Sequence, residues 1–253
     1  KLYLIDSHPI GKNVRSTLAT YSGVFTHIRK LYAKLDKSVE NNLTLKDFSY
    51  NTGSLRCPTC NGTGQINLDV QFLPDVEITC PDCEGLRFSN ESDNIRYNGY
   101  SIKELMALSI DEAIEVFANE KVILNKLKTL SGMGLGYLTL GEDTPSLSGG
   151  EAQRLKLSSQ MGKKLDNSLF IFDEPTIGLH PLDVKKLIKI FDNLIKSNAT
   201  IIVIEHDLDL IRNADYIIDM GPKGGVEGGR IIAEGTLEDI INNNKSITAK
   251  YLK

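Results

Sequence analysis

The fold is decided by the stretch Leu169-Phe170-Ile171-Phe172-Asp173-Glu174, in which four apolar residues run directly into two acidic ones. A short continuous apolar run is typical of a buried strand, and strands buried on both faces belong to parallel sheets. Open α/β sheets bind ligands at the carboxyl ends of their strands, where these two carboxylates would emerge. The alternative is an ordinary buried strand that ends in two acids at a turn.

Apolar runs and amphipathic helices alternate around this strand through the last hundred residues. We expect further strands at 200–204, 216–220 and 230–233, helices at 184–195 and 207–214, and a terminal helix capped by Thr236 and Asp239. This alternation predicts an α/β domain with a largely parallel sheet. The strand expected at 200–204 is also predicted to be buried.

The part of the chain before the strand carries helical patterns. Residues 24–35 read as one helix, and residues 101–131 recur at helix spacing with a possible capping box at Ser109 and Glu112. Residues 132–150 are rich in glycine, so we expect a loop there. A helix is predicted to follow from about 151 to 164.

The composition is that of a folded globular protein. The chain has 253 residues, of which 41 % are hydrophobic and 25 % charged, which excludes disorder, collagen and coiled coil for most of its length. No apolar run approaches the roughly 20 residues of a membrane helix. The chain has no signal peptide and does not begin with Met, so we expect a fragment.

The net charge of −4 hides an asymmetry. Residues 1–56 carry a net charge of +5, and residues 57–253 carry −9. The basic segment is suited to an anionic partner, although an ordinary solvated surface would give the same pattern.

All four cysteines lie close together, as Cys57-x2-Cys60, a gap of 19 residues, and Cys80-x2-Cys83. Two such knuckles give a tetrahedral zinc ion four thiolate ligands and no open position, which indicates a structural site. Disulfides or a redox pair are the alternatives, but nothing else in the sequence suggests secretion. Weak alternation between the pairs predicts a β-hairpin with its turn near Pro74.

The segment Leu147-Ser148-Gly149-Gly150-Glu151-Ala152-Gln153-Arg154 opens the helix predicted at 151–164. Ser-Gly-Gly at a helix start presents a hydroxyl and backbone N–H groups to an anion, and the glycines let a phosphate approach the backbone. A simple N-cap after a flexible loop is the alternative.

These motifs, taken in order, resemble those of ABC-type ATPases. Leu147–Arg154 resembles their signature sequence, and Leu169–Glu174 resembles their Walker B strand. Thr176–His180 resembles their D-loop, and Val203–Asp207 resembles the segment with the switch histidine. Four motifs in this order identify the chain as a member of the ABC ATPase class.

The particular forms of the motifs resemble those of the UvrA family, the ATPase component of the ABC excinuclease. Cys57–Arg87, with Phe72-Leu73-Pro74-Asp75 before the second cysteine pair, resembles the last zinc module of that family. Residues 9–25 resemble its flanking segment, and residues 220–225 and 248–252 resemble its C-terminus. The resemblance covers almost the whole chain and implies the C-terminal part of the second ABC ATPase domain.

The resemblance implies an α/β, P-loop NTPase-like fold that lacks its Walker A part. It divides the chain into four parts, namely 1–56 as a basic Q-loop-side segment, 57–88 as a four-cysteine zinc-binding hairpin module, 89–165 as a helical signature subdomain, and 166–253 as the ATPase core with Walker B, D-loop and switch histidine.

The resemblance also implies a function. Members of this family are cytoplasmic, dimeric, ATP-dependent sensors of damaged double-stranded DNA in nucleotide excision repair, and they load the helicase component of the excinuclease at the lesion. The implied cofactors are structural Zn²⁺, ATP and Mg²⁺, and the implied partners include the upstream half of the same chain. A UvrA-like paralogue in drug self-resistance and a zinc-stapled assembly module without ATPase activity are the alternatives.

Roles carry over at the positions that match. Asp173 would support Mg²⁺, Glu174 would be the general base, and His206 would sense the γ-phosphate. The implied ATP contacts are Ser148, Gly149, Gly150, Gln153 and Gly178. The zinc ligands would be the four cysteines, and their hairpin would lie near DNA. The candidate phosphate contacts in the basic segment are Lys12, Arg15, Arg29 and Lys30.

The sequence departs from the family pattern in two places. No G-x-x-x-x-G-K-[ST] loop occurs in the 253 residues, so the backbone cradle and Lys for the β- and γ-phosphates must lie upstream. Ser7 stands where the Q-loop Gln would fall, and a serine is too short to bridge Mg²⁺ and the attacking water in the same way.

The missing Walker A loop leads to a testable prediction. The 253-residue chain alone is expected to hydrolyse no ATP, because it lacks the Walker A lysine and cradle. Phosphate release by the purified chain would be compared with that of Glu174→Gln. Turnover that the substitution abolishes would contradict the prediction.

Overall fold

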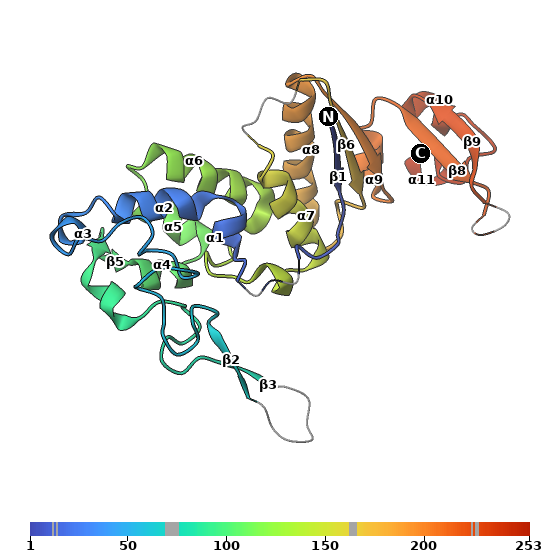
Figure 1. Cartoon of the computed structure of the whole chain (residues 1–253). Coiled ribbons are helices and arrows are strands. Elements are labelled where there is room, and N and C mark those ends of the chain that lie inside the picture. Colours follow the sequence, from blue (N-terminus) through green and yellow to red (C-terminus); the bar gives the residue numbers. More distant parts are fainter. Residues whose placement is uncertain (12, 14, 69–75, 162–165, 224, 226–227) are drawn as a thin grey trace. The chain divides into compact units, whose positions relative to one another are not determined.

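The computed structural model describes residues 1–253 except 12, 14, 69–75, 162–165, 224 and 226–227. The chain forms two compact units (Figure 1). Lys1–Asp6 with Lys164–Lys253 form the sheet unit, and Ser7–Lys163 form the helical unit. Among the described residues, no helix has the length and apolar character that crossing a membrane requires.

A three-stranded parallel sheet forms the centre of the sheet unit. β6 (Ser168–Asp173) lies between β1 (Leu2–Ile5) and β7 (Ala199–Ile204). The strands predicted at 169–172 and 200–204 are confirmed with slightly wider bounds. No strand was predicted at Leu2–Ile5. Its pairing with β6 decides its conformation.

The two faces of this sheet differ. Phe170 and Phe172 are buried on one face, and Phe172 packs against Phe191 of α8 (Pro181–Lys196), with ring centroids 4.7 Å apart. The register places a second apolar row on the opposite face, and its members are exposed: Leu2 by 66 %, Leu4 by 60 %, Ile202 by 48 % and Ile204 by 52 %. None of residues 169–172 is exposed, in agreement with a buried strand, whereas the predicted burial of 200–204 is wrong because α8 covers only one face of the sheet.

A second, antiparallel sheet completes the sheet unit. β8 (Ile217–Gly221) pairs with β9 (Arg230–Gly235), and α10 (Leu237–Ile241) and α11 (Ala249–Leu252) pack a small core on them. The short helix after β7 is α9 (Leu208–Arg212), capped by Asp207. The prediction of one largely parallel sheet was wrong for β8 and β9, because a parallel crossover needs a dozen or more residues and their connection is shorter.

The helical unit is built from short elements (Figure 1). The zinc-module hairpin is confirmed as β2 (Gln65–Leu68) paired antiparallel with β3 (Val76–Thr79), while its predicted turn near Pro74 lies outside the described residues. The remaining elements are α1 (Leu18–Tyr21), α2 (Val24–Tyr32), α3 (Asp36–Glu40), η1 (Asn90–Asn94), β4 (Arg96–Tyr97), β5 (Tyr100–Ser101), α4 (Ile102–Ala107), α5 (Ile110–Val116), α6 (Lys121–Leu130), η2 (Ser131–Leu135), η3 (Thr144–Ser146) and α7 (Gly149–Ser158).

Capping residues divide the helical segment 101–131 into α4, α5 and α6. Ser101 and Ser109 each form a capping box, with Glu104 and Glu112 respectively, so the predicted box at Ser109 is confirmed. Leu108 between the first two helices has extended backbone. Backbone hydrogen bonds from the two serines lower the pKa of Glu104 and of Glu112. These boxes satisfy helix-end N–H groups that a longer helix would pair internally.

Two other predicted bounds shift for local reasons. The helix predicted over 24–35 ends at Tyr32, whose carbonyl accepts a hydrogen bond from the Ser38 hydroxyl at 2.6 Å. The glycine-rich stretch 132–150 contains η2, in which Gly134 adopts φ +74°. The following helix, α7, starts at Gly149 rather than 151 because Ser148 caps it. Its described end is Ser158.

Arg87 is the largest fully buried side chain among the described residues, at 2 % exposure. Its guanidinium donates to the Gly62 carbonyl at 3.3 Å and forms an ion pair with Asp143. Its Cζ atom lies 5.2 Å from the Tyr50 ring centroid. Burial raises the pKa of Asp143, and the Arg87 charge opposes that rise. Arg87 thus joins the cysteine module to the loop that precedes the helix α7.

Removing the guanidinium should destabilise this unit. We expect Arg87→Met to lower the free energy of unfolding by about 3 kcal/mol, because it leaves the partly buried Asp143 carboxylate without its partner. Adding Asp143→Asn should recover part of that loss. Urea unfolding followed by circular dichroism measures both, with the exposed Lys34→Met as control. Equal stability of Arg87→Met and wild type would contradict the structural role.

Candidate functional site

The four cysteines converge on one point. Their sulfur atoms all lie within 4.8 Å of one another, with 3.9 Å between Cys57 and Cys80 and 3.6 Å between Cys60 and Cys83. All four are buried and none forms a disulfide. Tetrahedral zinc with Zn–S bonds of about 2.3 Å requires sulfur atoms about 3.8 Å apart. The donor set therefore fits a zinc ion.

Each cysteine pair is followed by the same local turn. Asn61 and Gly62 have φ of 51° and 77°, and Glu84 and Gly85 have φ of 52° and 83°. A Cβ at Gly62 would lie 1.7 Å from the Tyr50 carbonyl oxygen, so only glycine fits there. Burial raises the pKa of Cys57 and Cys83. At Cys60, hydrogen bonds from the Gly64 backbone and with the Cys83 and Cys57 side chains outweigh burial and lower the pKa to about 7.

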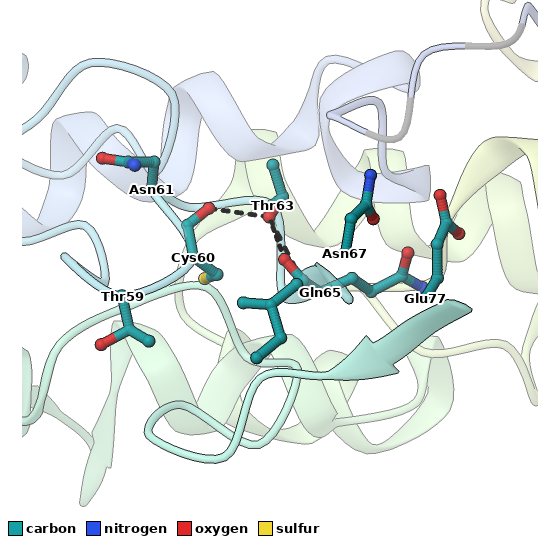
Figure 2. Close-up of a pocket in the computed structure, with 8 residues that line it drawn as sticks. Thr59, Cys60, Asn61, Thr63, Gln65, Asn67 and Glu77 are labelled. Carbon is teal, nitrogen blue, oxygen red and sulfur yellow. Dashed lines mark hydrogen bonds between the residues drawn. The ribbon is translucent and has the colours of Figure 1, made fainter. Parts of the chain in front are cut away.

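A hollow lies beside this cluster, at the base of the hairpin, and Figure 2 shows its lining. The Thr63 hydroxyl donates to the carbonyls of Cys60 and Gln65, each at 2.7 Å, and ties the knuckle to β2. The other lining residues are Thr59, Asn61, Ile66, Asn67 and Glu77. Among the described residues that line it there is no Lys or Arg.

The predicted DNA contacts have different surroundings. Arg15 is partly exposed, and its guanidinium donates to the Asn61 carbonyl at 3.0 Å. Lys30 is exposed on α2. Arg29 is half-buried and donates twice to the Leu45 carbonyl, at 3.2 and 2.6 Å, so it holds a loop. Lys12 lies outside the described residues. The DNA role of all four stays a prediction.

The predicted signature begins α7 with a full capping box. The Glu151 N–H donates to the Ser148 hydroxyl oxygen at 3.4 Å, and the Ser148 N–H donates to the Glu151 carboxylate at 2.7 Å. The Tyr137 hydroxyl donates to the other oxygen of Glu151. Burial and the neighbouring Glu151 raise the pKa of Tyr137 to about 12. The Ser148 hydroxyl acts as a hydrogen-bond acceptor within the capping box.

Other signature residues are less exposed. The Gln153 side chain is 2 % exposed and therefore packs inside the helical unit rather than on its surface. Gly150 is buried at the first turn of α7. A Cβ at Gly149 would lie 3.1 Å from the Ser7 Cβ. Lys156 of α7 donates to the His8 carbonyl at 2.8 Å, so the segment that carries Ser7 runs against the signature helix.

The predicted catalytic residues lie in the sheet unit. Asp173 ends β6, and Glu174 follows it with φ +47°. The His206 Nε2 atom lies 3.2 Å from a Glu174 carboxylate oxygen, and the His206 side chain is 83 % exposed. Gly178 turns the chain toward α8 with φ +72°. The structure thus brings Glu174 and His206 together, while Ser148 and Gly149 belong to the other unit.

Two residues that position the predicted site residues, Tyr137 and Glu205, were not predicted from the sequence. Tyr137 fixes Glu151 in the capping box, and Glu205 bonds to Thr176 and to the His206 backbone. An acid directly before a histidine at a strand end was a readable signal for Glu205. Tyr137 had none, because its position against α7 depends on η2.

These features define the chain as a segment with the α/β fold class of ABC-type ATPases and an inserted four-cysteine module. No protein-family model matches it. It is 44 % identical over 254 positions to UvrABC system protein A of Staphylococcus aureus (strain COL), and 45 % over 255 positions to that of Listeria monocytogenes serotype 4b (strain F2365). The chain belongs to the UvrA family.

A solved structure has the same fold. UvrA2 from Deinococcus radiodurans superposes with a TM-score of 0.92 and 39 % identity, over 100 % of this chain and 31 % of that one. The matches to the two bacterial sequences cover 100 % of this chain and 27 % of each relative. The chain therefore spans about a quarter of the length of the curated relatives it matches.

The close approach of Gly149 and Ser7 can be tested by substitution. A methyl group in Gly149→Ala would also lie 3.2 Å from the Ser7 carbonyl oxygen, so Ser7 must move. We expect a loss of about 1 kcal/mol in the free energy of unfolding. Ser7→Gly in the same chain should relieve part of it. Gly132→Ala is the control, because its added Cβ meets no atom within 4 Å. Equal effects at both glycines would contradict the packing.

Proposed function

We propose that the chain is part of an ATP-dependent DNA-damage recognition protein of nucleotide excision repair. The observation that carries the proposal is the 44 % identity to UvrABC system protein A along the whole of this chain. The pairing of Glu174 with His206 and the capped glycine pair at the start of α7 agree with it, because both are arrangements that suit a nucleotide.

In this proposal the chain contributes two different surfaces to ATP hydrolysis. Asp173 would hold Mg²⁺, which would supply positive charge to neutralise the phosphates. Glu174 would orient the attacking water, and His206 beside it would donate to the γ-phosphate. The hydroxyl of Ser148 and the N–H groups of Gly149 and Gly150 would contact ATP held by another domain's Walker A loop. Gln153, being buried, would support α7, and Gly178 would set the D-loop turn.

The four cysteines would hold one structural zinc ion that keeps the hairpin rigid. We propose the sequence-based division at 1–56, 57–88, 89–165 and 166–253 as functional parts within the two observed units. The open apolar face of β1 and β7 would be covered by the upstream half of the same protein, because the relatives extend far beyond the matched quarter. The complete protein would be a cytoplasmic homodimer that binds the helicase component of the excinuclease.

DNA would be held by its backbone. Of the four candidate phosphate contacts, Lys30 is exposed and Arg15 is partly exposed, and Lys12 is three residues before Arg15 in sequence. The rest of the chain is acidic, so the DNA path would be confined to this segment and the adjacent hairpin. A sensor of this kind responds to DNA deformability rather than to base sequence.

A paralogue of the repair protein is the second candidate, because the solved structure with the same fold is titled UvrA2. The test uses the complete protein with ATP and Mg²⁺. A lesion-bearing duplex and its undamaged twin are titrated at two salt concentrations. Tighter binding to the lesion supports the repair function. Equal binding favours the paralogue, and no binding favours an assembly module.

The same titration tests the basic segment. Arg15→Ala should weaken binding equally for all sequences and reduce the slope of log K against log salt by about 1, because one phosphate contact is lost. Lys245→Ala, at an exposed lysine of the sheet unit, is the matched control. A slope unchanged by Arg15→Ala would remove Arg15 from the DNA path.

A further inference from the structure

We propose that Glu205 is a positioning residue that clamps the loops after β6 and β7 together and so places His206 against Glu174. The inference rests on the proposed function, because it concerns the residues proposed to hydrolyse ATP. The Glu205 carboxylate contacts neither the Glu174 side chain nor the His206 imidazole. It acts through the backbone of one loop and through Thr176 of the other.

The two loops leave the sheet side by side. Asp173 stands opposite Ile204 in the parallel register, and the ladder continues one bond beyond the strands, where the Glu174 N–H donates to the Ile204 carbonyl at 2.8 Å. The next residue after β7 is Glu205. This register brings its side chain within reach of the loop after β6.

Each oxygen of the Glu205 carboxylate serves a different loop. Oε1 accepts from the Thr176 N–H at 3.0 Å and from the Thr176 hydroxyl. Oε2 accepts from the His206 N–H at 2.8 Å. Thr176 begins the segment that resembles the D-loop, and His206 is the predicted switch histidine. One half-buried carboxylate therefore fixes the backbone of both.

The contacts close into a ring. Glu174 and Thr176 are two residues apart on one loop, and Glu205 and His206 are neighbours on the other. Glu205 bonds to Thr176, while His206 lies 3.2 Å from Glu174. The imidazole is 83 % exposed, so little packing holds it. Its distance to Glu174 depends on the clamp behind it.

Carboxylate chemistry makes the clamp testable. All three partners are donors, so the side chain must accept at both oxygens. In Glu205→Gln one oxygen becomes an NH₂ donor, which faces a donor on one of the two loops. The substitution preserves the shape of the side chain and removes its hydrogen bonding to one of the two loops. Glu205→Ala removes the hydrogen bonds to both loops.

The first arm measures amide hydrogen exchange by NMR on the 253-residue chain. Glu205→Ala should speed exchange at both Thr176 and His206 by about tenfold or more, and Glu205→Gln at only one of them. Glu238→Gln, at an exposed acid of α10, should change neither. Unchanged exchange at both amides in Glu205→Ala would overturn the clamp.

The second arm measures ATP hydrolysis by the complete protein. Glu205→Gln should lower kcat about tenfold and leave KM for ATP nearly unchanged, because Glu205 places catalytic groups without touching the nucleotide. Glu238→Gln, at the exposed acid of α10, should retain wild-type kcat. A normal kcat in Glu205→Gln would overturn the positioning role.

The two arms also separate the inference from the proposed function. If the complete wild-type protein hydrolysed no ATP, the proposed function and the effect of Glu205 on kcat would both fail. Exchange at Thr176 and His206 would still decide whether the clamp exists.

Discussion

The parallel hydrogen-bond ladder on both edges of β6 is the interaction on which the candidate site depends. It pairs Leu2 with Leu169 and Ile171 with Ile202, and so joins segments that are far apart in the sequence. Parallel strands present their carboxyl ends at one edge of a sheet. Asp173 and the pair Glu205 and His206 therefore emerge together, before any nucleotide or metal binds. The same pairing leaves the apolar side chains of β1 and β7 exposed on the face of the sheet opposite α8.

The helical unit follows a different physical rule. Its helices have 4 to 10 residues, and isolated helices of that length are marginal in water. Capping boxes at Thr17, Ser101, Ser109 and Ser148 compensate for the short lengths, and each cap is worth about 1 kcal/mol. Arg87 and the cysteine cluster then hold irregular segments that no helix or sheet could hold.

The same device recurs beside both sets of proposed nucleotide contacts. Near α7, Glu151 accepts from the Ser148 N–H and the Tyr137 hydroxyl. After β7, Glu205 accepts from the His206 N–H and the Thr176 hydroxyl. Glu151 takes one backbone donor and one hydroxyl donor, and Glu205 takes two backbone donors and one hydroxyl donor. Neither carboxylate is itself proposed to touch ATP. These carboxylates fix the loop backbones at Ser148 and His206, whose own side chains are the ones proposed to contact ATP.

The sequence alone determined the features that depend on near neighbours. The strand at 169–172, the box at Ser109, the hairpin and the convergence of four cysteines could all be read from spacing, and the motif order was sufficient for the family. Tertiary structure decided what pairing and packing control. β1 became a strand only by pairing with β6, and β8 joined β9 because their connection is too short for a crossover. Gln153 was assigned to ATP and is buried, and Glu205 was passed over and joins two loops. Those roles depend on residues distant in sequence, which no local pattern records.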